Sequence, residues 1–128
     1  IRGVWDRMDD MFRVSGTNLT VFVPKELDHH IAEMLNQKTD WIMEQKNIRR
    51  IVFDFRETDF MDSSGIGVIM GRYRNINLIG GKVEAVHVND RIDKLLHMSG
   101  IYKLISISRE KKWNIKGNQK GEQYGEHE

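Results

Sequence analysis

The stretch IVFDFRETDFMDSSGIGVIMGRYRNINLI, residues 51–79, passes from an apolar strand through a polar link into a helix. Residues 51–55 form a short, mostly apolar run, which is typical of a central strand covered on both faces. Farther along, apolar side chains recur at helical spacing: Ile66, Ile69, Tyr73 and Ile76. Because Gly80-Gly81 provides a helix stop, the pattern predicts a helix over residues 63–79.

Two glycines, Gly67 and Gly71, lie one turn apart inside this predicted helix. A glycine costs a helix interior about 1 kcal/mol relative to alanine. We therefore expect these two positions to mark a close approach between the helix and the sheet.

The segment upstream predicts a hairpin followed by a helix. Two β-forming runs, residues 11–14 and 19–23, are separated by a turn cluster, and Pro24 ends the second run. Asp28 is a good capping residue for a helix that we expect to end near Asn47. One face of that helix is predicted to carry Ile31, Leu35, Thr39 and Ile42, with Met34 and Trp41 beside them.

The segment downstream predicts two more strands around a short helix. Residues 82–88 read as a strand, Asn89 can cap a helix that ends at Ser99-Gly100, and residues 102–107 read as the last strand. The complete order is ββαβαβαβ. This order predicts an α/β fold with a mixed sheet and helices packed against it.

Length and composition narrow the class of protein. The chain has 128 residues, which fits one domain, and we divide it into a leader of uncertain structure (1–10), a folded domain (11–107) and a polar C-terminal tail (108–128). There are no cysteines, so disulfides are excluded. The net charge of +1 provides no pull toward nucleic acid or anionic lipid. Because no apolar run approaches the ~20 residues that cross a bilayer, we expect a soluble cytoplasmic protein.

The most informative chemistry lies at the start of the second predicted helix, in Asp62-Ser63-Ser64-Gly65-Ile66-Gly67. A helix N-terminus collects unpaired N–H groups and the positive end of the helix dipole, so an anion is stabilised there. A phosphate on Ser63 would add about 1.5 to 2 negative charges beside Asp62. Spacing alone favours a simpler role, in which Asp62 or Ser63 only caps the helix.

Other chemistries have weaker support. Ser63 could be a nucleophile with His29 or His30 as base and Asp28 or Asp62 as orienting acid, but the glycine-x-serine-x-glycine elbow is missing. The glycines after Ser64 match no phosphate-binding loop. The histidines lack the spacing of metal ligands, so neither a metal nor another cofactor is expected.

Three segments together resemble the STAS domain, and more narrowly the anti-sigma factor antagonists of sporulation and stress response in Gram-positive bacteria. The stretch from Asp62 to Tyr73 is similar to the family signature. The segment Glu26-Leu27-Asp28-His29-His30 is similar to the opening of the family's first helix, and residues 95–100 are similar to the end of its third helix. The resemblance covers roughly residues 11–107.

The resemblance implies a switch between protein partners and no catalytic activity. In such a switch, the unphosphorylated antagonist binds an anti-sigma factor that is also a serine kinase, and this binding frees a sigma factor. Phosphorylation of the first serine of the motif, which is Ser63 here, prevents the binding. A serine phosphatase removes the phosphate again. The implied binding surface comprises Asp28, Asp62, Ser63, Ser64, Gly65 and Ile66. A STAS scaffold or sensor module, or a nucleotide-binding STAS protein, is the alternative.

This sequence departs from the family pattern at two places. Pro24-Lys25 precedes Glu26 where the family usually has a glycine, and the polar tail lacks the amphipathic final helix that is common in the family. These departures bear on the choice of partner more than on the fold. The sequence names no particular sigma factor, kinase or phosphatase, and the oligomeric state stays open.

Overall fold

The computed structural model describes residues 10–110, which form a five-stranded mixed sheet and a separate two-stranded sheet, with helices packed on them. In chain order the elements are β1 (Phe12–Ser15), β2 (Asn18–Phe22), β3 (Glu26–Leu27), α2 (His29–Gln45), β4 (Arg50–Asp54), β5 (Phe60–Met61), α3 (Ser63–Asn77), β6 (Lys82–Val88), α4 (Asp90–Met98), the 3-10 turn η1 (Ile101–Lys103) and β7 (Ser106–Arg109). The predicted α/β class and the hairpin followed by alternating strands and helices are confirmed. Most of the predicted leader and most of the predicted tail lie outside the described residues.

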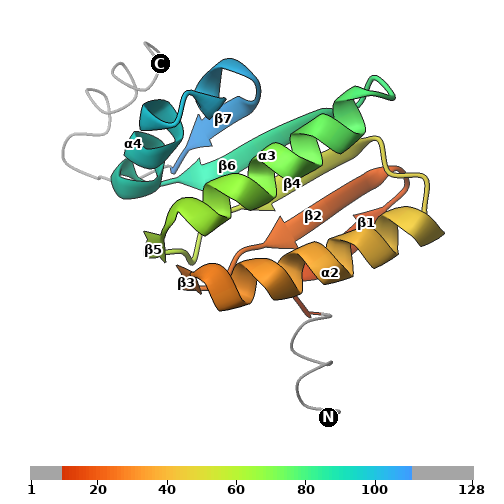
Figure 1. The fold of residues 1–128 in the computed structure, drawn as a ribbon, viewed down its shortest axis with the longest axis horizontal. Helices are drawn as coiled ribbons and strands as arrows, with labels where there is room; N and C mark the ends of the chain where they lie inside the picture. Colours follow the sequence, from red (N-terminus) through yellow and green to blue (C-terminus); the bar gives the residue numbers. More distant parts are fainter. Residues whose placement is uncertain (1–9, 111–128) are drawn as a thin grey trace, which may run out of the picture.

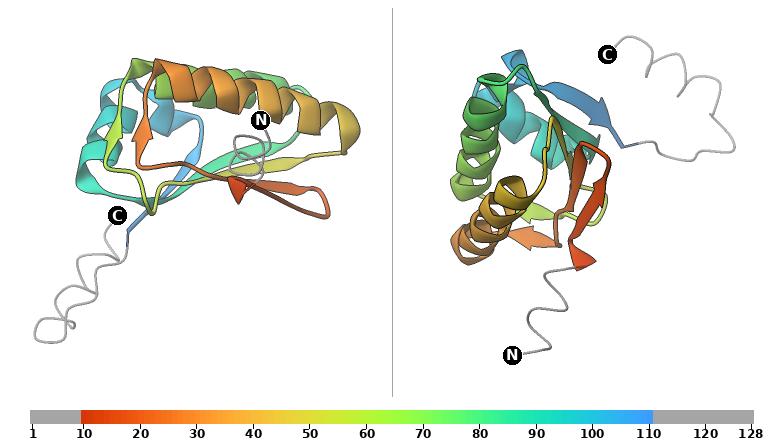
Figure 2. Two further views of the ribbon diagram at one scale, coloured as in Figure 1. Left: turned by 90° about the horizontal axis from the view of Figure 1, so that it is seen from below. Right: turned by 90° about the vertical axis from the view of Figure 1, so that its right-hand side faces the viewer.

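The main sheet has the strand order β1-β2-β4-β6-β7. Strand β1 runs antiparallel to β2, and the other neighbouring strands pair in parallel. Helices α2 and α3 lie side by side over one face of the sheet, as Figures 1 and 2 show. The parallel strands therefore place the starts of both helices at the same end of the molecule.

The hydrophobic core lies between the sheet and these two helices. Alternate strand residues such as Leu19, Ile51 and Phe53 are fully buried beneath α2 and α3. The helices contribute Leu35 and Ile69 among their buried side chains. Strand residues that alternate with a period of two and helix residues that recur with a period of 3.6 thus pack together in one core.

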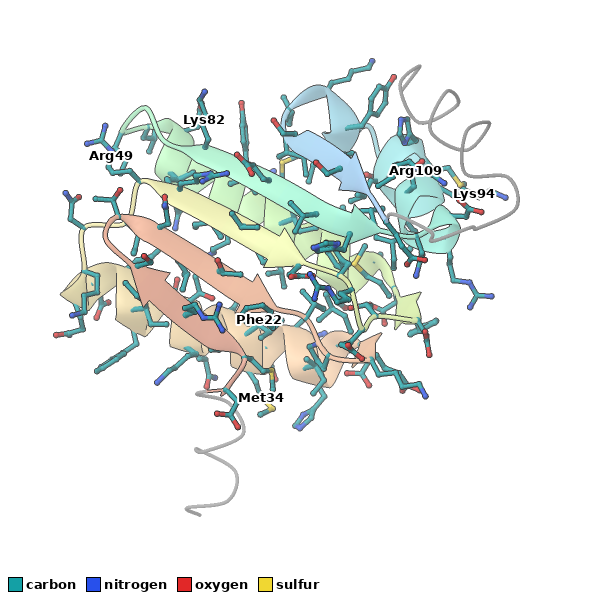
Figure 3. The ribbon with its side chains drawn as sticks, turned by 180° about the vertical axis from the view of Figure 1, so that it is seen from behind. Phe22, Met34, Arg49, Lys82, Lys94 and Arg109 are labelled. Carbon is teal, nitrogen blue, oxygen red and sulfur yellow. The ribbon has the colours of Figure 1, made fainter. Side chains whose placement is uncertain are left out.

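The opposite face of the sheet is crossed by no helix of the described residues (Figure 3). Phe22 lies on this face under the guanidinium of Arg13, 5.1 Å from its ring centre. Arg50 donates two hydrogen bonds to Glu84, at 2.9 and 2.8 Å, and this pairing raises the pKa of Arg50. Cations therefore shield part of the apolar surface on this side.

The last strand is present, but its predicted bounds, residues 102–107, are wrong. Residues 101–103 form η1 and the strand runs from Ser106 to Arg109. Gly100 adopts a left-handed conformation (φ 82°) at the end of α4, and the turn that follows buries Ile101 completely. The first two residues of the predicted strand, Tyr102 and Lys103, thus belong to this turn, which packs on the core through Ile101.

The prediction for the two helix glycines is also wrong. A Cβ atom at Gly67 or Gly71 would meet nothing within 4 Å, so neither marks a close approach to the sheet. The close approach occurs at Gly65, two residues earlier, where a Cβ would lie 2.4 Å from Cγ of Met61. The buried face of α3 runs through Val68 and Ile69, which turns Gly67 toward solvent.

Candidate partner-binding site

The site is organised by a second, very short sheet that the sequence did not reveal. Strands β3 and β5 pair in parallel, with Glu26 opposite Phe60 and Leu27 opposite Met61. The backbone N–H of Asp62 then donates to the carbonyl of Leu27 at 3.3 Å. Because each strand leads directly into a helix, this pairing brings the N-termini of α2 and α3 together (Figure 1).

Both helices begin with an aspartate cap. The Oδ1 atom of Asp28 accepts a hydrogen bond from the N–H of Ile31 at 3.0 Å. The Oδ1 atom of Asp62 accepts one from the N–H of Ser64 at 2.8 Å. Asp62 rather than Ser63 is therefore the cap of α3, and the hydroxyl of Ser63 is not needed for that role.

Ser63 is the first residue of α3 and is exposed. At this position its side chain stands at the end of the helix where the first N–H groups have no partner within the helix. Ser64 is half-buried, and its Oγ lies 3.5 Å from Nδ1 of His29. This contact joins the first turns of α2 and α3, and it does not involve the exposed Ser63.

Gly65 allows the close packing beneath the site. A Cβ at this position would lie 2.4 and 2.5 Å from Met61 Cγ and Sδ and 2.9 Å from Leu27 Cδ2. The small sheet can therefore pack directly against the first turn of α3. Ile66, one residue farther, is half-buried and packs on the core.

The six residues that the resemblance implied thus lie at one end of the molecule. They differ in what they present to a partner, because Ser63 is exposed, Asp28, Asp62, Ser64 and Ile66 are half-buried, and Gly65 is buried. Sequence reasoning missed the pairing of β3 with β5 and the contact between His29 and Ser64. A strand of two residues carries no detectable alternation, so periodicity could not have found it.

The geometry does not assemble the hydrolase that the sequence left as an alternative. His29 approaches Ser64, whereas the exposed serine is Ser63. The carboxylates of Asp28 and Asp62 accept from backbone N–H groups of their own helices, and both act as caps. A nucleophile-base-acid chain through Ser63 is therefore not formed.

Residues 10–110 contain neither a metal-binding cluster nor a membrane-spanning helix. In this part of the chain no three His, Asp or Glu side chains gather into a group that could hold a metal ion. No helix described here combines the length and apolar character needed to span a membrane.

Comparison with known proteins agrees with this architecture. The STAS domain family matches residues 11–112. The anti-sigma F factor antagonist of Paenibacillus polymyxa is 40% identical over 89 residues, which cover 70% of this chain and 76% of that protein. The chain therefore belongs to the STAS domain family and, within it, to the anti-sigma factor antagonists.

Two solved structures have the same fold. One is the anti-sigma factor antagonist SpoIIAA in its unphosphorylated form, with a TM-score of 0.68 and 23% identity over 89% of this chain and 96% of that one. The other is the Bacillus cell fate determinant SpoIIAA in the phosphorylated form, with a TM-score of 0.62 and 26% identity over 77% of this chain and 92% of that one. The fold therefore matches a relative solved in both forms.

Proposed function

We propose that the unphosphorylated chain binds an anti-sigma factor of the serine-kinase type, and that phosphorylation of Ser63 prevents this binding. The observation that carries the proposal is the exposed hydroxyl of Ser63 at the N-terminus of α3, where Asp62 already provides the cap. A kinase can reach such a hydroxyl without breaking a hydrogen bond that the helix needs. The likeness to an anti-sigma F factor antagonist supports the class of partner.

The binding surface in this proposal is the end of the molecule where α2 and α3 begin. It comprises the accessible parts of Asp28, Asp62, Ser63, Ser64 and Ile66, with Gly65 contributing backbone. The pairing of Leu27 with Met61 holds the two helix starts in a fixed relation. A partner therefore meets a preformed surface, which reduces the entropy lost on binding.

Phosphorylation acts in this proposal by charge. A phosphoserine adds about 1.5 to 2 negative charges at pH 7. The N-terminus of α3 tolerates the added phosphate, but the carboxylates of Asp28 and Asp62 stand at the same surface. Burying an unpaired charge in an interface costs several kcal/mol, and each 1.4 kcal/mol is a tenfold loss of affinity. The phosphorylated surface is thereby excluded from the complex while the domain stays folded.

The protein has no catalytic activity of its own in this scheme. Its partners are the anti-sigma factor kinase and a serine phosphatase that restores the unphosphorylated form. We place the cycle in the cytoplasm, where ATP and the sigma factor are present. No cofactor takes part on the side of this chain.

The decisive experiment titrates the anti-sigma factor kinase of the same organism against the wild type, Ser63→Ala and Ser63→Asp by calorimetry. The matched control is Ser106→Ala, which removes the hydroxyl of an exposed serine on β7, outside the proposed binding surface. We expect Ser63→Ala and the control to bind within a few-fold of the wild type and Ser63→Asp to bind at least tenfold more weakly. Equal affinity of Ser63→Asp and the wild type would contradict the proposal.

A second measurement tests the modification itself. Incubation with the kinase and ATP should add one phosphate to the wild type and to Ser64→Ala, but none to Ser63→Ala, as read by intact mass. No mass gain in the wild type with a kinase that phosphorylates another substrate would favour a scaffold role for the domain.

A further inference from the structure

Phe60 lies three residues before Ser63, on β5, and its side chain is 41% exposed. All five phenylalanines of the chain fall within the described residues, and the other four are buried or half-buried. Its neighbour Met61 is buried, since alternate strand residues point to opposite sides. Phe60 therefore presents its ring outward, next to the proposed phosphorylation site.

The backbone around Phe60 is fixed. Its N–H and that of Asp59 both donate to the carbonyl of Lys25, at 3.2 and 2.8 Å. The side chains of Lys25 and Asp59 form an ion pair at 3.7 Å, and Glu26 stands opposite Phe60 in the ladder. The ring is thus carried by a paired strand and not by a loose loop, although the fold itself would accept a polar β-former here.

A single exposed apolar side chain is common on protein surfaces and means little by itself. Phe60 differs from other exposed apolar residues because it lies close to Ser63. Three peptide units separate its Cα from that of Ser63 by at most about 11 Å. A standard interface covers about 800 Å² on each partner, a patch roughly 30 Å across. A partner footprint centred on Ser63 therefore includes Phe60.

We propose that Phe60 is the apolar anchor of the partner-binding surface and that the anti-sigma factor offers an apolar pocket for its ring. This inference rests on the proposed function, because it assumes the same partner. Aromatic side chains near the centre of an interface supply much of its binding energy. The division of roles is then clear: Phe60 provides affinity, and the charge state of Ser63 decides whether the surface can be buried.

The test compares Phe60→Ala and Phe60→Thr with the wild type in unphosphorylated form. Threonine removes the ring and keeps a strong strand-former on β5, so it guards against a loss of local structure. The control is Leu78→Ala, because Leu78 is 86% exposed and lies at the far end of α3, about 20 Å from Ser63. Each variant is titrated with the anti-sigma factor kinase, and its initial rate of phosphorylation is measured at kinase concentrations below saturation.

Both Phe60 variants should bind about tenfold to a hundredfold more weakly, with a similar fall in kcat/KM for phosphorylation, whereas Leu78→Ala should match the wild type. Prolonged incubation with excess kinase should still add one phosphate to Phe60→Thr, which would show that its acceptor site is intact. Wild-type affinity in both variants would overturn the role of Phe60 and leave the proposed function standing. Failure of the wild type itself to bind or to be phosphorylated would overturn the proposed function, and this inference with it.

Discussion

Gly65 and Gly67 lie two residues apart in the first turns of α3. Alanine at Gly65 should lower the free energy of unfolding of the domain, whereas alanine at Gly67 should raise it. Alanine gains up to about 1 kcal/mol over glycine in a helix. At Gly67 nothing opposes this gain, since a Cβ would meet no atom within 4 Å. At Gly65 the new methyl would lie 2.4 Å from Met61 Cγ and 2.9 Å from Leu27 Cδ2. Overpacking of this kind costs about 1 to 3 kcal/mol.

The helix-propensity gain is similar at the two positions, so it largely cancels when the two variants are compared with each other. The difference in their free energies of unfolding should therefore be the overpacking cost, about 1 to 3 kcal/mol. Urea unfolding followed by circular dichroism measures it, and with an m-value of about 1 to 3 kcal/mol/M the midpoints should differ by roughly 1 M. If Gly65→Ala were as stable as Gly67→Ala, Met61 would have room to move aside, and the tight packing beneath α3 would be refuted.

Two further predictions concern buried polar groups away from the helix starts. Arg72 is 7% exposed and donates to Asp40 at 2.6 Å, so Asp40→Asn should destabilise the domain by about 1.5 to 3 kcal/mol by leaving that cation without its anion. Arg72→Met should cost less in the same urea titration, because it also removes a buried Nε without a partner; a larger cost would contradict this reasoning. Thr58 is buried and its hydroxyl donates to the carbonyls of Val23 and Pro24 at 3.0 Å, so Thr58→Val should lose about 1 to 2 kcal/mol, and an unchanged thermal midpoint would argue against it.

The sequence predicts the long elements of this fold well because their signals extend over many residues. The helix start at Asp28 is confirmed by its hydrogen bond to Ile31, and the stop at Gly80-Gly81 by the bond from the Gly81 N–H to the Ile76 carbonyl at 2.8 Å. Capping residues and an apolar stripe are local properties, so they can be read without knowing the rest of the fold. The strand predicted over residues 82–88 has the predicted bounds for the same reason.

The errors share a physical cause, which is that a local pattern does not say what a residue will meet. Glycine spacing indicated Gly67 and Gly71, but the glycine in close contact is Gly65, and the contacting side chains come from β3 and β5. Similarly, the last strand was predicted to begin at Tyr102, although residues 101–103 form a turn that is held on the core by the buried Ile101. In both cases tertiary packing decided the local structure. The residues that make the deciding contacts lie elsewhere in the chain, so the local pattern could not reveal them.

The site depends on the same non-local information. Asp28 and Asp62 are 34 positions apart, and residue patterns alone gave no reason to place them together; only the family resemblance did. The structure supplies the reason, because Leu27 pairs with Met61 and each strand continues directly into its helix. A two-residue ladder is thus enough to put two capped helix starts, and the exposed serine beside them, on one surface. Since the cap of α3 is Asp62, a phosphate on Ser63 would alter the charge of that surface without removing the hydrogen bond that begins the helix. For this reason the proposed switch needs no change of fold.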